Sequence, residues 1–292
     1  MKHVLITGTS SGFGLVSAVE LARRGWRVTA TMRNLAKREP LDAAVRGAGV
    51  ADRVDVGTLD VTDGASITAA WERATASGDG RVDAIVHNAG VAVGAAFEDL
   101  PEPEARRVME TNFWGVLALT RVALPTLRRQ HSGRILVVSS NSAYTGEPAN
   151  GIYCASKWAV EGWAESLAFE VEPFGIDVVL VEPGPYRTEI WGSSPRILPD
   201  GSPYTAYLRR LEKAIEAHVE KDARDPQEVA DVIADALQVE RPRFRYPVSP
   251  QAKIGYLLRG ILPATLHRRI VTRMLGLRGG NDDSAPQRRR GA

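Results

Sequence analysis

Short apolar runs alternate with longer segments of helical period along most of this chain. Runs such as residues 135–138 contain no polar residue, which is expected of strands that are buried on both faces of a parallel sheet. Parallel neighbours require a crossover connection, and such crossovers are right-handed. The alternation therefore predicts an α/β fold, a Rossmann-like doubly wound parallel sheet of about seven strands. The expected strands are residues 4–7, 27–32, 54–59, 82–87, 134–139 and 177–181, with a seventh near 246–248.

The segments between these strands predict the helices. They cover residues 17–24, 67–76, 104–129, 155–172, 205–220 and 226–239. The last has a clear start, with Asp225 as N-cap, Pro226 at the first helical position and Glu228 three residues after the cap. One open sheet with its helices can use most of a chain of 292 residues. We expect a single domain over residues 1–252, followed by a C-terminal helical extension over 253–292.

Composition and cysteine content indicate an ordinary globular protein. Hydrophobic residues make up 44% and charged residues 25% of the chain, which does not suggest disorder. The single Cys154 excludes an internal disulfide and fits a reducing compartment. Residues 4–6 are too short an apolar run for a signal-peptide core, and no stretch approaches the roughly 18 apolar residues that span a bilayer. We expect a cytoplasmic protein.

A glycine-rich turn follows the first expected strand. Residues 7–14 read TGTSSGFG and lead into a helix, which gives the spacing GxxxGxG. Backbone N–H groups and the positive end of a helix dipole in such a turn bind a pyrophosphate. Glycines alone would be weak evidence, because any tight strand-to-helix turn requires them. Their position after the first strand favours a dinucleotide site that includes Gly8, Ser10, Ser11, Gly12, Phe13 and Gly14.

The end of the second strand bears on the choice of nicotinamide cofactor. An acidic residue there binds the ribose 2′-hydroxyl of NAD, whereas an arginine accommodates the 2′-phosphate of NADP. Here the strand ends Thr31-Met32-Arg33-Asn34, without an acid. Arg33 could also be a solvated charge at a strand end, but the missing carboxylate argues separately against strict NAD use. The sequence predicts that NADP(H) is preferred and that NAD(H) is possible.

Ser140, Tyr153 and Lys157 form the most specific constellation in the second half of the chain. Tyr153 and Lys157 are four residues apart at the start of a helix and share one face. A phenol has an ordinary pKa of about 10, and a nearby ammonium lowers it toward the range useful for acid/base catalysis. Ser140 could hydrogen-bond the substrate oxygen and orient it. A Tyr and Lys pair alone is more often a surface pair, but the glycine turn favours catalysis.

Together these motifs resemble the classical short-chain dehydrogenase/reductase (SDR) family, in the family's order, from residue 7 to about residue 188. The resemblance implies a catalytic tetrad of Asn112, Ser140, Tyr153 and Lys157. In it, Lys157 binds the nicotinamide ribose and lowers the phenol pKa, Tyr153 moves the proton, and Asn112 holds a proton-relay water. The separation of thirteen positions from Ser140 to Tyr153 favours Ser140 over its neighbouring serines.

The resemblance also implies further cofactor contacts. Tyr153 and Lys157 are among the expected cofactor-binding residues, together with Asp60 and Val61 at the adenine, the NNAG motif and the PGxxxT stretch at the nicotinamide. The first Asn of NNAG is replaced by His87, for which we expect tolerance with a changed hydrogen-bond network. The residues that match these motifs are Asp60, Val61, Asn88, Ala89, Gly90, Pro183, Gly184 and Thr188.

These features predict an NADP(H)-dependent oxidoreductase that interconverts an alcohol and its carbonyl. A non-catalytic NADP-binding sensor or scaffold is the alternative, although it would have no reason to keep the tetrad. Aromatic residues after the strand ends suggest a bulky apolar substrate such as a steroid, retinoid or lipid-like compound, unless they simply pack. The resemblance to hydroxysteroid and retinol dehydrogenases points the same way. The candidate substrate residues are Tyr144, Pro185, Tyr186 and Trp191, with the loop 192–203.

The C-terminal extension is basic. Residues 253–292 contain nine Lys and Arg against two Asp, a charge of +7 that leaves −5 on the rest of the chain, so nucleic-acid binding is not expected. Residues 253–278 have an apolar stripe that Pro263 should interrupt. Such a segment could contact a membrane surface, cover the substrate pocket or pack on another subunit. Beyond residue 279 we expect disorder.

The sequence also predicts the protein's partners. The family resemblance suggests a homodimer or homotetramer packed through the long helices after the fourth and fifth strands. The five His residues show no metal-ligand spacing, and we expect no metal site. Cys154 is expected to pack in the interior or line the pocket.

Overall fold

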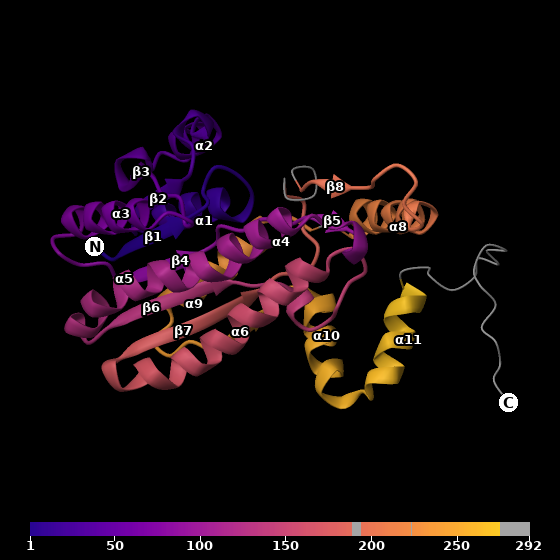
Figure 1. Ribbon diagram of the computed structural model, residues 1–292. Helices are drawn as coiled ribbons and strands as arrows, with labels where there is room; N and C mark the ends of the chain where they lie inside the picture. The colour runs from indigo at the N-terminus through magenta and orange to yellow at the C-terminus, as the bar shows by residue number, and fades with distance from the viewer. Residues whose placement is uncertain (189–193, 223, 275–292) are drawn as a thin grey trace, which may run out of the picture.

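A computed structural model of the protein describes residues 1–188, 194–222 and 224–274 (Figure 1). Seven parallel strands form one sheet in the order β3-β2-β1-β4-β6-β7-β9. The order reverses between β1 and β4, which confirms the predicted doubly wound topology. All seven expected strands are present, with ends shifted by at most two residues. The strands are β1 His3–Thr7, β2 Arg27–Met32, β3 Val54–Thr58, β4 Ala84–His87, β6 Gly133–Val138, β7 Ile176–Glu182 and β9 Arg245–Pro247.

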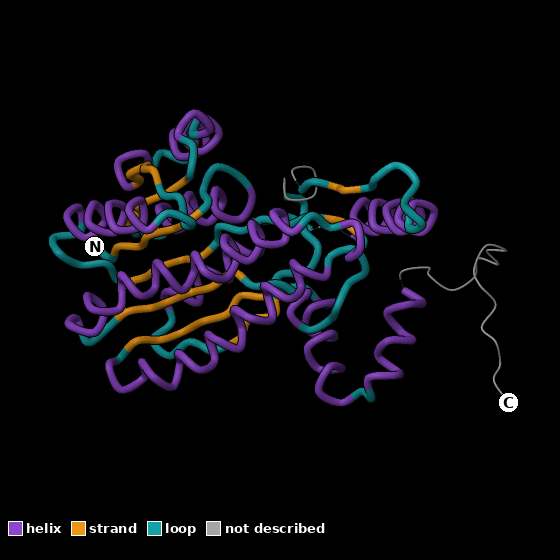
Figure 2. Tube along the Cα trace, in the orientation of Figure 1, coloured by secondary structure: helices purple, strands orange, loops and turns teal. Residues whose placement is uncertain are grey.

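Helices cover both faces of the sheet, with the strands as the middle layer (Figures 1 and 2). One face buries apolar residues of α1 Gly12–Arg23, α2 Glu39–Gly47 and α9 Gln227–Gln238. The other face buries apolar residues of α3 Gly64–Ser77, α5 Gly115–Gln130 and α6 Gly151–Val171.

Strand β1 shows why the strands need no alternation of polar residues. Val4 and Ile6 join the core on the α1 side, whereas Leu5 between them joins the core on the α3 side. Successive side chains of a strand point to opposite faces, and here both faces are covered. All three residues are fully buried. Each such side chain contributes roughly 1.5–3 kcal/mol, which fixes the strand at the centre of the sheet.

Several boundaries differ from the predictions. The first helix begins at Gly12 rather than at residue 17, because the glycine turn itself supplies its first turn. The long helix predicted over 104–129 is divided into α4 Glu102–Met109, a π-helical turn Glu110–Trp114 and α5. The sequence missed α2, and it missed a small separate sheet of β5 Gly94–Ala95 and β8 Arg196–Ile197.

The last part of the described chain is helical. Helix α8 spans Thr205–Asp222, and a hairpin of α10 Pro250–Ile261 and α11 Ala264–Met274 extends beyond the sheet (Figure 1). Pro263 separates the two hairpin helices, as expected. The expected boundary at residue 252 falls inside α10. Residues 192 and 193 of the expected loop and the end beyond residue 279 lie outside the described residues.

Candidate active site

The turn between β1 and α1 requires its glycines. Gly8 has a φ of +72°, and a Cβ on it would lie 2.8 Å from the Cα of Ala89. A Cβ on Gly14 would lie 2.3 Å from the carbonyl oxygen of Gly8 and 2.4 Å from Nδ2 of Asn88. Helix α1 begins at Gly12, and its first N–H groups have no partner within the helix. The turn therefore has the form of a pyrophosphate cradle.

The side chains of the same turn leave the cradle open. Ser10, Ser11 and Phe13 are half-buried. Ser11 stands at the N-cap with an extended backbone, and its hydroxyl makes no capping bond to the helix. The Phe13 ring packs edge-on against Tyr186 with ring centroids 5.5 Å apart. The structure thus places the predicted phosphate-binding residues together at the start of α1.

The loop after β4 is fastened to the glycine turn. Nδ2 of Asn88 donates hydrogen bonds to the carbonyls of Thr7 and Gly8, both at 2.9 Å. The backbone N–H groups of Asn88 and Ala89 both donate to the hydroxyl of Thr7, at 3.0 and 2.9 Å. Asn88 and Ala89 therefore hold the shape of the cradle, which is a structural role for two of the predicted cofactor residues.

Asn112 joins this loop to helix α6. Its side chain accepts from the N–H of Val91 at 2.9 Å and donates to the carbonyl of Val91 at 2.9 Å and the hydroxyl of Ser156 at 3.0 Å. A Cβ on Gly90 would lie 3.5 Å from Oδ1 of Asn112 and 3.9 Å from Nζ of Lys157. Asn112 lies in the π-helical turn, a feature that often occurs at functional sites.

Ser140, Tyr153 and Lys157 meet at the carboxyl edge of the sheet. Tyr153 lies in the first turn of α6, Lys157 lies one turn later, and Ser140 follows β6 by two residues. The Ser140 hydroxyl is hydrogen-bonded to the Tyr153 phenol. Nζ of Lys157 donates to the carbonyl of Val138 at 2.9 Å and lies 5.7 Å from the centroid of the Tyr153 ring. A phenol, a hydroxyl and an ammonium thus lie close together at this edge of the sheet.

The charges of this group differ from the prediction in one respect. Burial raises the pKa of the Tyr153 phenol above its ordinary value, the Glu147 charge adds to the rise, and the hydrogen bond with Ser140 offsets part of it. The net shift of the phenol pKa is therefore upward, and Lys157, whose ammonium donates to the Val138 carbonyl, is not among the groups that contribute to it. The expected lowering of the phenol pKa by Lys157 stays a prediction. Burial lowers the pKa of Lys157 itself to about 8, against the opposing effect of Glu161.

The adenosine side of the site is more open. Arg33 is exposed directly after β2, and within the described residues its guanidinium makes no hydrogen bond or ion pair. Oδ1 of Asp60 accepts from the N–H of Thr62 at 2.9 Å and from its hydroxyl at 2.7 Å, which shapes the turn after β3. Val61 is buried, and a Cβ on Gly115 would lie 2.8 Å from its carbonyl oxygen.

The segment after β7 returns to the glycine turn. A Cβ on Gly12 would lie 3.6 Å from Cβ of Thr188, so the end of this segment lies beside the start of α1. Pro183 is buried, and a Cβ on Gly184 would lie 2.3 Å from Oγ of Ser249. The predicted PGxxxT residues thus lie along the same edge of the sheet as the tetrad.

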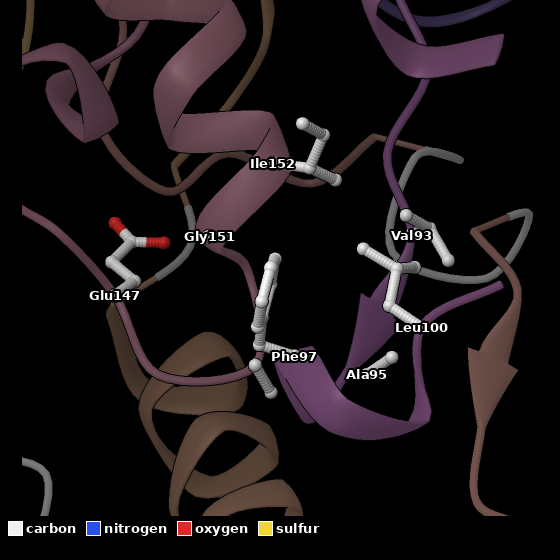
Figure 3. Close-up of a pocket in the computed structure, with 8 residues that line it drawn as sticks. Val93, Ala95, Phe97, Leu100, Glu147, Gly151 and Ile152 are labelled. Carbon is white, nitrogen blue, oxygen red and sulfur yellow. The ribbon is translucent and has the colours of Figure 1, made fainter. Parts of the chain in front are cut away.

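A hollow lies beside the first turn of α6 (Figure 3). Its wall is mostly apolar and includes Ile152, the residue next to Tyr153. Glu147 is the acidic residue of the wall, and it accepts hydrogen bonds from Ser142 at 2.9 Å and from Asn150 at 2.9 Å. The residues that line the hollow are Val93, Ala95, Phe97, Leu100, Glu147, Ala149, Gly151 and Ile152.

Comparison with known proteins gives the family. A family model described as short chain dehydrogenase matches residues 2–196. The chain belongs to the short chain dehydrogenase family. It is 38% identical to an uncharacterized oxidoreductase of Bacillus subtilis, YusZ, over 279 residues, which cover 94% of this chain and 98% of that protein. It is also 38% identical to human 17-beta-hydroxysteroid dehydrogenase type 1 over 252 residues, 83% of this chain and 76% of the human protein.

Solved structures agree with this assignment. A short-chain dehydrogenase from Streptomyces avermitilis superposes with a TM-score of 0.77 at 32% identity, covering 94% of this chain and 97% of that one. The protein is therefore an oxidoreductase of the short chain dehydrogenase family, and the resemblance to the hydroxysteroid and retinol dehydrogenase branch is confirmed.

The substrate residues expected in this short chain dehydrogenase need correction. Tyr186 is 1% exposed, packs on Phe13 and donates to Glu228 at 3.2 Å, so it belongs to the core on the α1 side rather than to a pocket. Tyr144 is buried, and its ring lies 5.4 Å from that of Tyr256 in α10. Pro185 is half-buried, and Trp191 lies outside the described residues.

Sequence reasoning missed the apolar wall of the hollow. Val93, Phe97 and Leu100 follow β4, and Ile152 lies in the first turn of α6, so they lie at the same edge of the sheet as the candidate tetrad. The available signal was their position just after the HNAG motif, at the edge where parallel sheets bind ligands. The prediction instead followed aromatic residues, which here are partly used for packing.

The structure gives His87 and Cys154 roles in packing and hydrogen bonding. His87 is buried, its Nε2 pairs with the hydroxyl of Thr120 at 3.0 Å, and burial lowers its pKa to about 3. The family asparagine is thus replaced by a neutral histidine with its own partner. Cys154 is buried and burial raises the pKa of its thiol to about 12, which fits packing rather than nucleophilic chemistry. No cluster of potential metal ligands occurs among the described residues.

A buried ionic network lies behind the tetrad. Arg245 of β9 donates to Glu161 of α6 and to Glu182 of β7, the latter at 2.8 Å, and Ser139 donates to Glu161 at 2.6 Å. Glu182 is fully buried, and burial with the neighbouring Glu161 charge raises its pKa to about 7. Glu161 lies one turn after Lys157, so this network borders the Lys157 ammonium.

In the part of the chain that the structure describes, every helix is too short or too polar to cross a bilayer.

Proposed function

We propose that the chain is an NADP(H)-dependent oxidoreductase that interconverts an alcohol and its carbonyl compound, with a preference for bulky apolar substrates. The observation that carries the proposal is the meeting of the Tyr153 phenol, the Ser140 hydroxyl and the Lys157 ammonium beside the glycine cradle. When bound, the nicotinamide supplies or accepts the hydride at the substrate carbon.

Side chains of the protein then protonate and orient the oxygen of the substrate. In reduction, the Tyr153 hydroxyl gives its proton to the oxygen of the carbonyl that receives the hydride, and the product is the alcohol. Ser140 donates a hydrogen bond that orients the same oxygen. Burial keeps the pKa of Tyr153 above its ordinary value, so the phenol is protonated at neutral pH and ready for reduction. Oxidation requires the phenolate and is expected to become faster as pH rises.

Lys157 and Asn112 support this chemistry. The Lys157 ammonium is positioned by the Val138 carbonyl and lies next to Gly90, which fits contact with the ribose of the nicotinamide. Asn112 fixes the loop after β4 to α6 through Val91 and Ser156. Its loss is expected to disturb the distance between the cradle and the phenol.

The choice of NADP(H) rests on Arg33. Its exposed guanidinium has no partner within the described residues and follows β2, where the adenosine ribose binds in doubly wound folds. A similar solved structure at 27% identity, an alcohol dehydrogenase from Thermococcus sibiricus, holds 5-hydroxy-NADP. We expect Arg33→Asp to weaken NADPH binding about 10- to 100-fold while NADH is affected much less, because a carboxylate repels the 2′-phosphate.

The cofactor prediction is checked by fluorescence titration of both reduced nucleotides. Arg46→Asp, an exposed arginine on α2, provides a matched control for the change in net charge. An Arg33→Asp protein that kept its full preference for NADPH would show that Arg33 does not select the cofactor.

The substrate class rests on the hollow at the first turn of α6, which Ile152 lines. Its mostly apolar wall suits a hydrophobic alcohol or ketone. The relatives that are named as a 17-beta-hydroxysteroid dehydrogenase and as retinol dehydrogenase 8 support the same class. A panel of steroid, retinoid and long-chain carbonyl compounds, followed by nicotinamide absorbance with each cofactor, tests it.

The catalytic proposal is tested at Tyr153. Tyr153→Phe removes the proton donor but keeps the ring, and we expect kcat to fall at least roughly 100-fold. Tyr246→Phe removes a phenol at β9 that, among the described residues, accepts a hydrogen bond from the N–H of Arg243, and it should keep full activity. Equal turnover by Tyr153→Phe and the parent would exclude the mechanism. Tight NADPH binding without turnover of any compound would favour a sensor.

We also propose a homo-oligomer that packs through α6. Its residues Ala155, Trp158, Gly162 and Phe169 are exposed along one face, with Trp158 and Phe169 42% and 73% exposed. Small and aromatic residues at this spacing suit the close approach of a second helix. A cytoplasmic location stays a prediction of the sequence.

A further inference from the structure

The hairpin of α10 and α11 presents apolar side chains to solvent. Ile254, Leu257 and Ile261 recur at the spacing of one helical face of α10 and are 55%, 62% and 77% exposed. Leu266 and Ile270 lie one turn apart on α11 and are also exposed. Large exposed side chains in such a regular pattern usually mark an interaction surface.

The opposite face of α10 is held by the rest of the protein. Ala252 is fully buried, and its N–H donates to Oγ of Ser249 at 3.0 Å. The ring of Tyr256 packs against Tyr144 with centroids 5.4 Å apart. The hairpin is therefore attached through one face while its apolar stripe points away from the body.

Basic residues accompany this apolar surface. Lys253, Arg268, Arg269 and Arg273 are exposed, and none of them makes an ion pair with another described residue. The sequence has no Asp or Glu between Glu240 and Asp282. The hairpin therefore carries uncompensated positive charge next to its apolar face, although the rest of the chain is acidic.

We propose that the α10–α11 hairpin docks the protein on an anionic lipid surface. The apolar side chains enter the boundary between headgroups and acyl chains, and the basic side chains contact the lipid phosphates. Neither helix can cross the bilayer, and Pro263 lies between them, so the hairpin lies along the surface. A second copy of the same face is a poor partner because it would place these cations against one another.

Vesicle sedimentation tests the proposal on the full chain. Vesicles of phosphatidylcholine alone are compared with vesicles of equal parts phosphatidylcholine and phosphatidylglycerol. We expect binding to the anionic vesicles only, with weaker binding as salt is added. Binding to neither kind of vesicle, or equal binding to both, would overturn the proposal.

Two variants separate the charges from the apolar contacts. Arg268→Gln with Arg269→Gln and Arg273→Gln should weaken binding roughly 100-fold, since each basic residue near an anionic bilayer strengthens it about five-fold. Leu257→Ser with Ile261→Ser should weaken it at least about ten-fold. The charge-matched control removes the exposed Arg23, Arg46 and Arg129 from α1, α2 and α5 and should bind nearly as well as the parent.

Sedimentation velocity and thermal melting complete the test. Variants that keep the melting temperature and oligomeric mass of the parent but lose vesicle binding support the proposal. If the Leu257→Ser and Ile261→Ser protein instead changes its mass and keeps its binding, the hairpin is a contact between copies and the proposal is wrong. Equal loss in the charge-matched control would also refute it, because net charge alone would then explain the binding.

Discussion

Burial has a larger effect than pairing on the ionisation of the catalytic residues. Lys157 is 6% exposed, and desolvation lowers the pKa of its ammonium to about 8 although Glu161 lies one turn away. Desolvation raises the pKa of the Tyr153 phenol for the same reason, since the charged form of each group is the one that loses water. Burial in the site therefore imposes a desolvation cost on the charged form of each group, which a surface pair would not have.

The desolvation cost of the Lys157 ammonium predicts an effect on the free energy of unfolding. The folded pKa of Lys157 lies below its ordinary value of 10.5, so the unfolded chain binds more protons between about pH 8 and 10.5. The cost of burying the ammonium is fully present below pH 8 and disappears as pH rises through that window. We expect Lys157→Met to be inactive but roughly 1–3 kcal/mol more stable at pH 7, with the difference shrinking toward pH 10.5.

Urea unfolding of the parent and the variant at several pH values measures this difference. Lys213→Met, which changes an exposed lysine on α8, should stay within about 0.5 kcal/mol of the parent throughout. If Lys157→Met were destabilising at pH 7 by as much as at pH 10.5, then the Val138 hydrogen bond would outweigh the desolvation cost.

The sequence predicted which residues lie together in the candidate tetrad but not how they ionise, and their catalytic role stays a prediction. Four-residue spacing placed Tyr153 and Lys157 on one face, and the structure brings Ser140 to them. The direction of the phenol pKa depends on which oxygen the ammonium reaches, and no spacing in the sequence specifies the Val138 carbonyl. Tyr186 was assigned to a pocket for a similar reason, because its burial depends on contact with Phe13 and α9.

At the scale of elements, the glycine turn is the most constrained connection. A Cβ on Gly14 would meet the Gly8 carbonyl at 2.3 Å and Nδ2 of Asn88 at 2.4 Å, so the turn must open or lose the Asn88 hydrogen bonds. We expect Gly14→Ala to cost about 1–3 kcal/mol of stability. We also expect it to weaken nicotinamide cofactor binding at least ten-fold, because the N–H groups move out of register with the phosphates.

Urea unfolding and fluorescence titration of the cofactor measure the two effects. Gly64→Ala is the matched control, since nothing lies within 4 Å of a Cβ at this exposed position in the first turn of α3. It should be neutral or stabilising by up to about 1 kcal/mol. A Gly14→Ala protein with parental stability and cofactor affinity would show that the turn is looser than the structure indicates.

The elements that sequence reasoning missed are those fixed by distant contacts. The strands of β5 and β8 are two residues long and pair across about 100 residues of chain, so neither has a local pattern. The π-helical turn Glu110–Trp114 interrupts a continuous helical period, and it holds Asn112, which bonds to the distant Val91 and Ser156. By contrast, Pro263 acts locally, and the helix break there was predicted.

For the whole molecule, the hydrophobic pattern predicted the layers of sheet and helices better than the surfaces that contact other molecules. The apolar runs predicted a parallel sheet with helices on both faces, because only burial on both faces makes polar alternation unnecessary. The sequence left three alternatives open for the basic C-terminal segment and named whole helices for subunit contact. The structure adds which side chains of α6 and of the α10–α11 hairpin are exposed.

The exposed face of α6 leads to a prediction about assembly. If α6 packs against its counterpart in a second copy, Phe169 at 73% exposure becomes buried, and a carboxylate at this position would be stranded in an apolar contact. We expect Phe169→Glu to raise the dissociation constant of the oligomer at least about 30-fold, as for a central aromatic contact. Val239→Glu, which changes an exposed residue after α9 on the other face of the sheet, should leave assembly unchanged.

Sedimentation equilibrium measures the mass of each assembly. The parent and Val239→Glu should share a mass that is a multiple of 31.7 kDa, and Phe169→Glu should have a smaller mass. Three proteins of equal mass would place the subunit contact elsewhere or show that the chain acts alone.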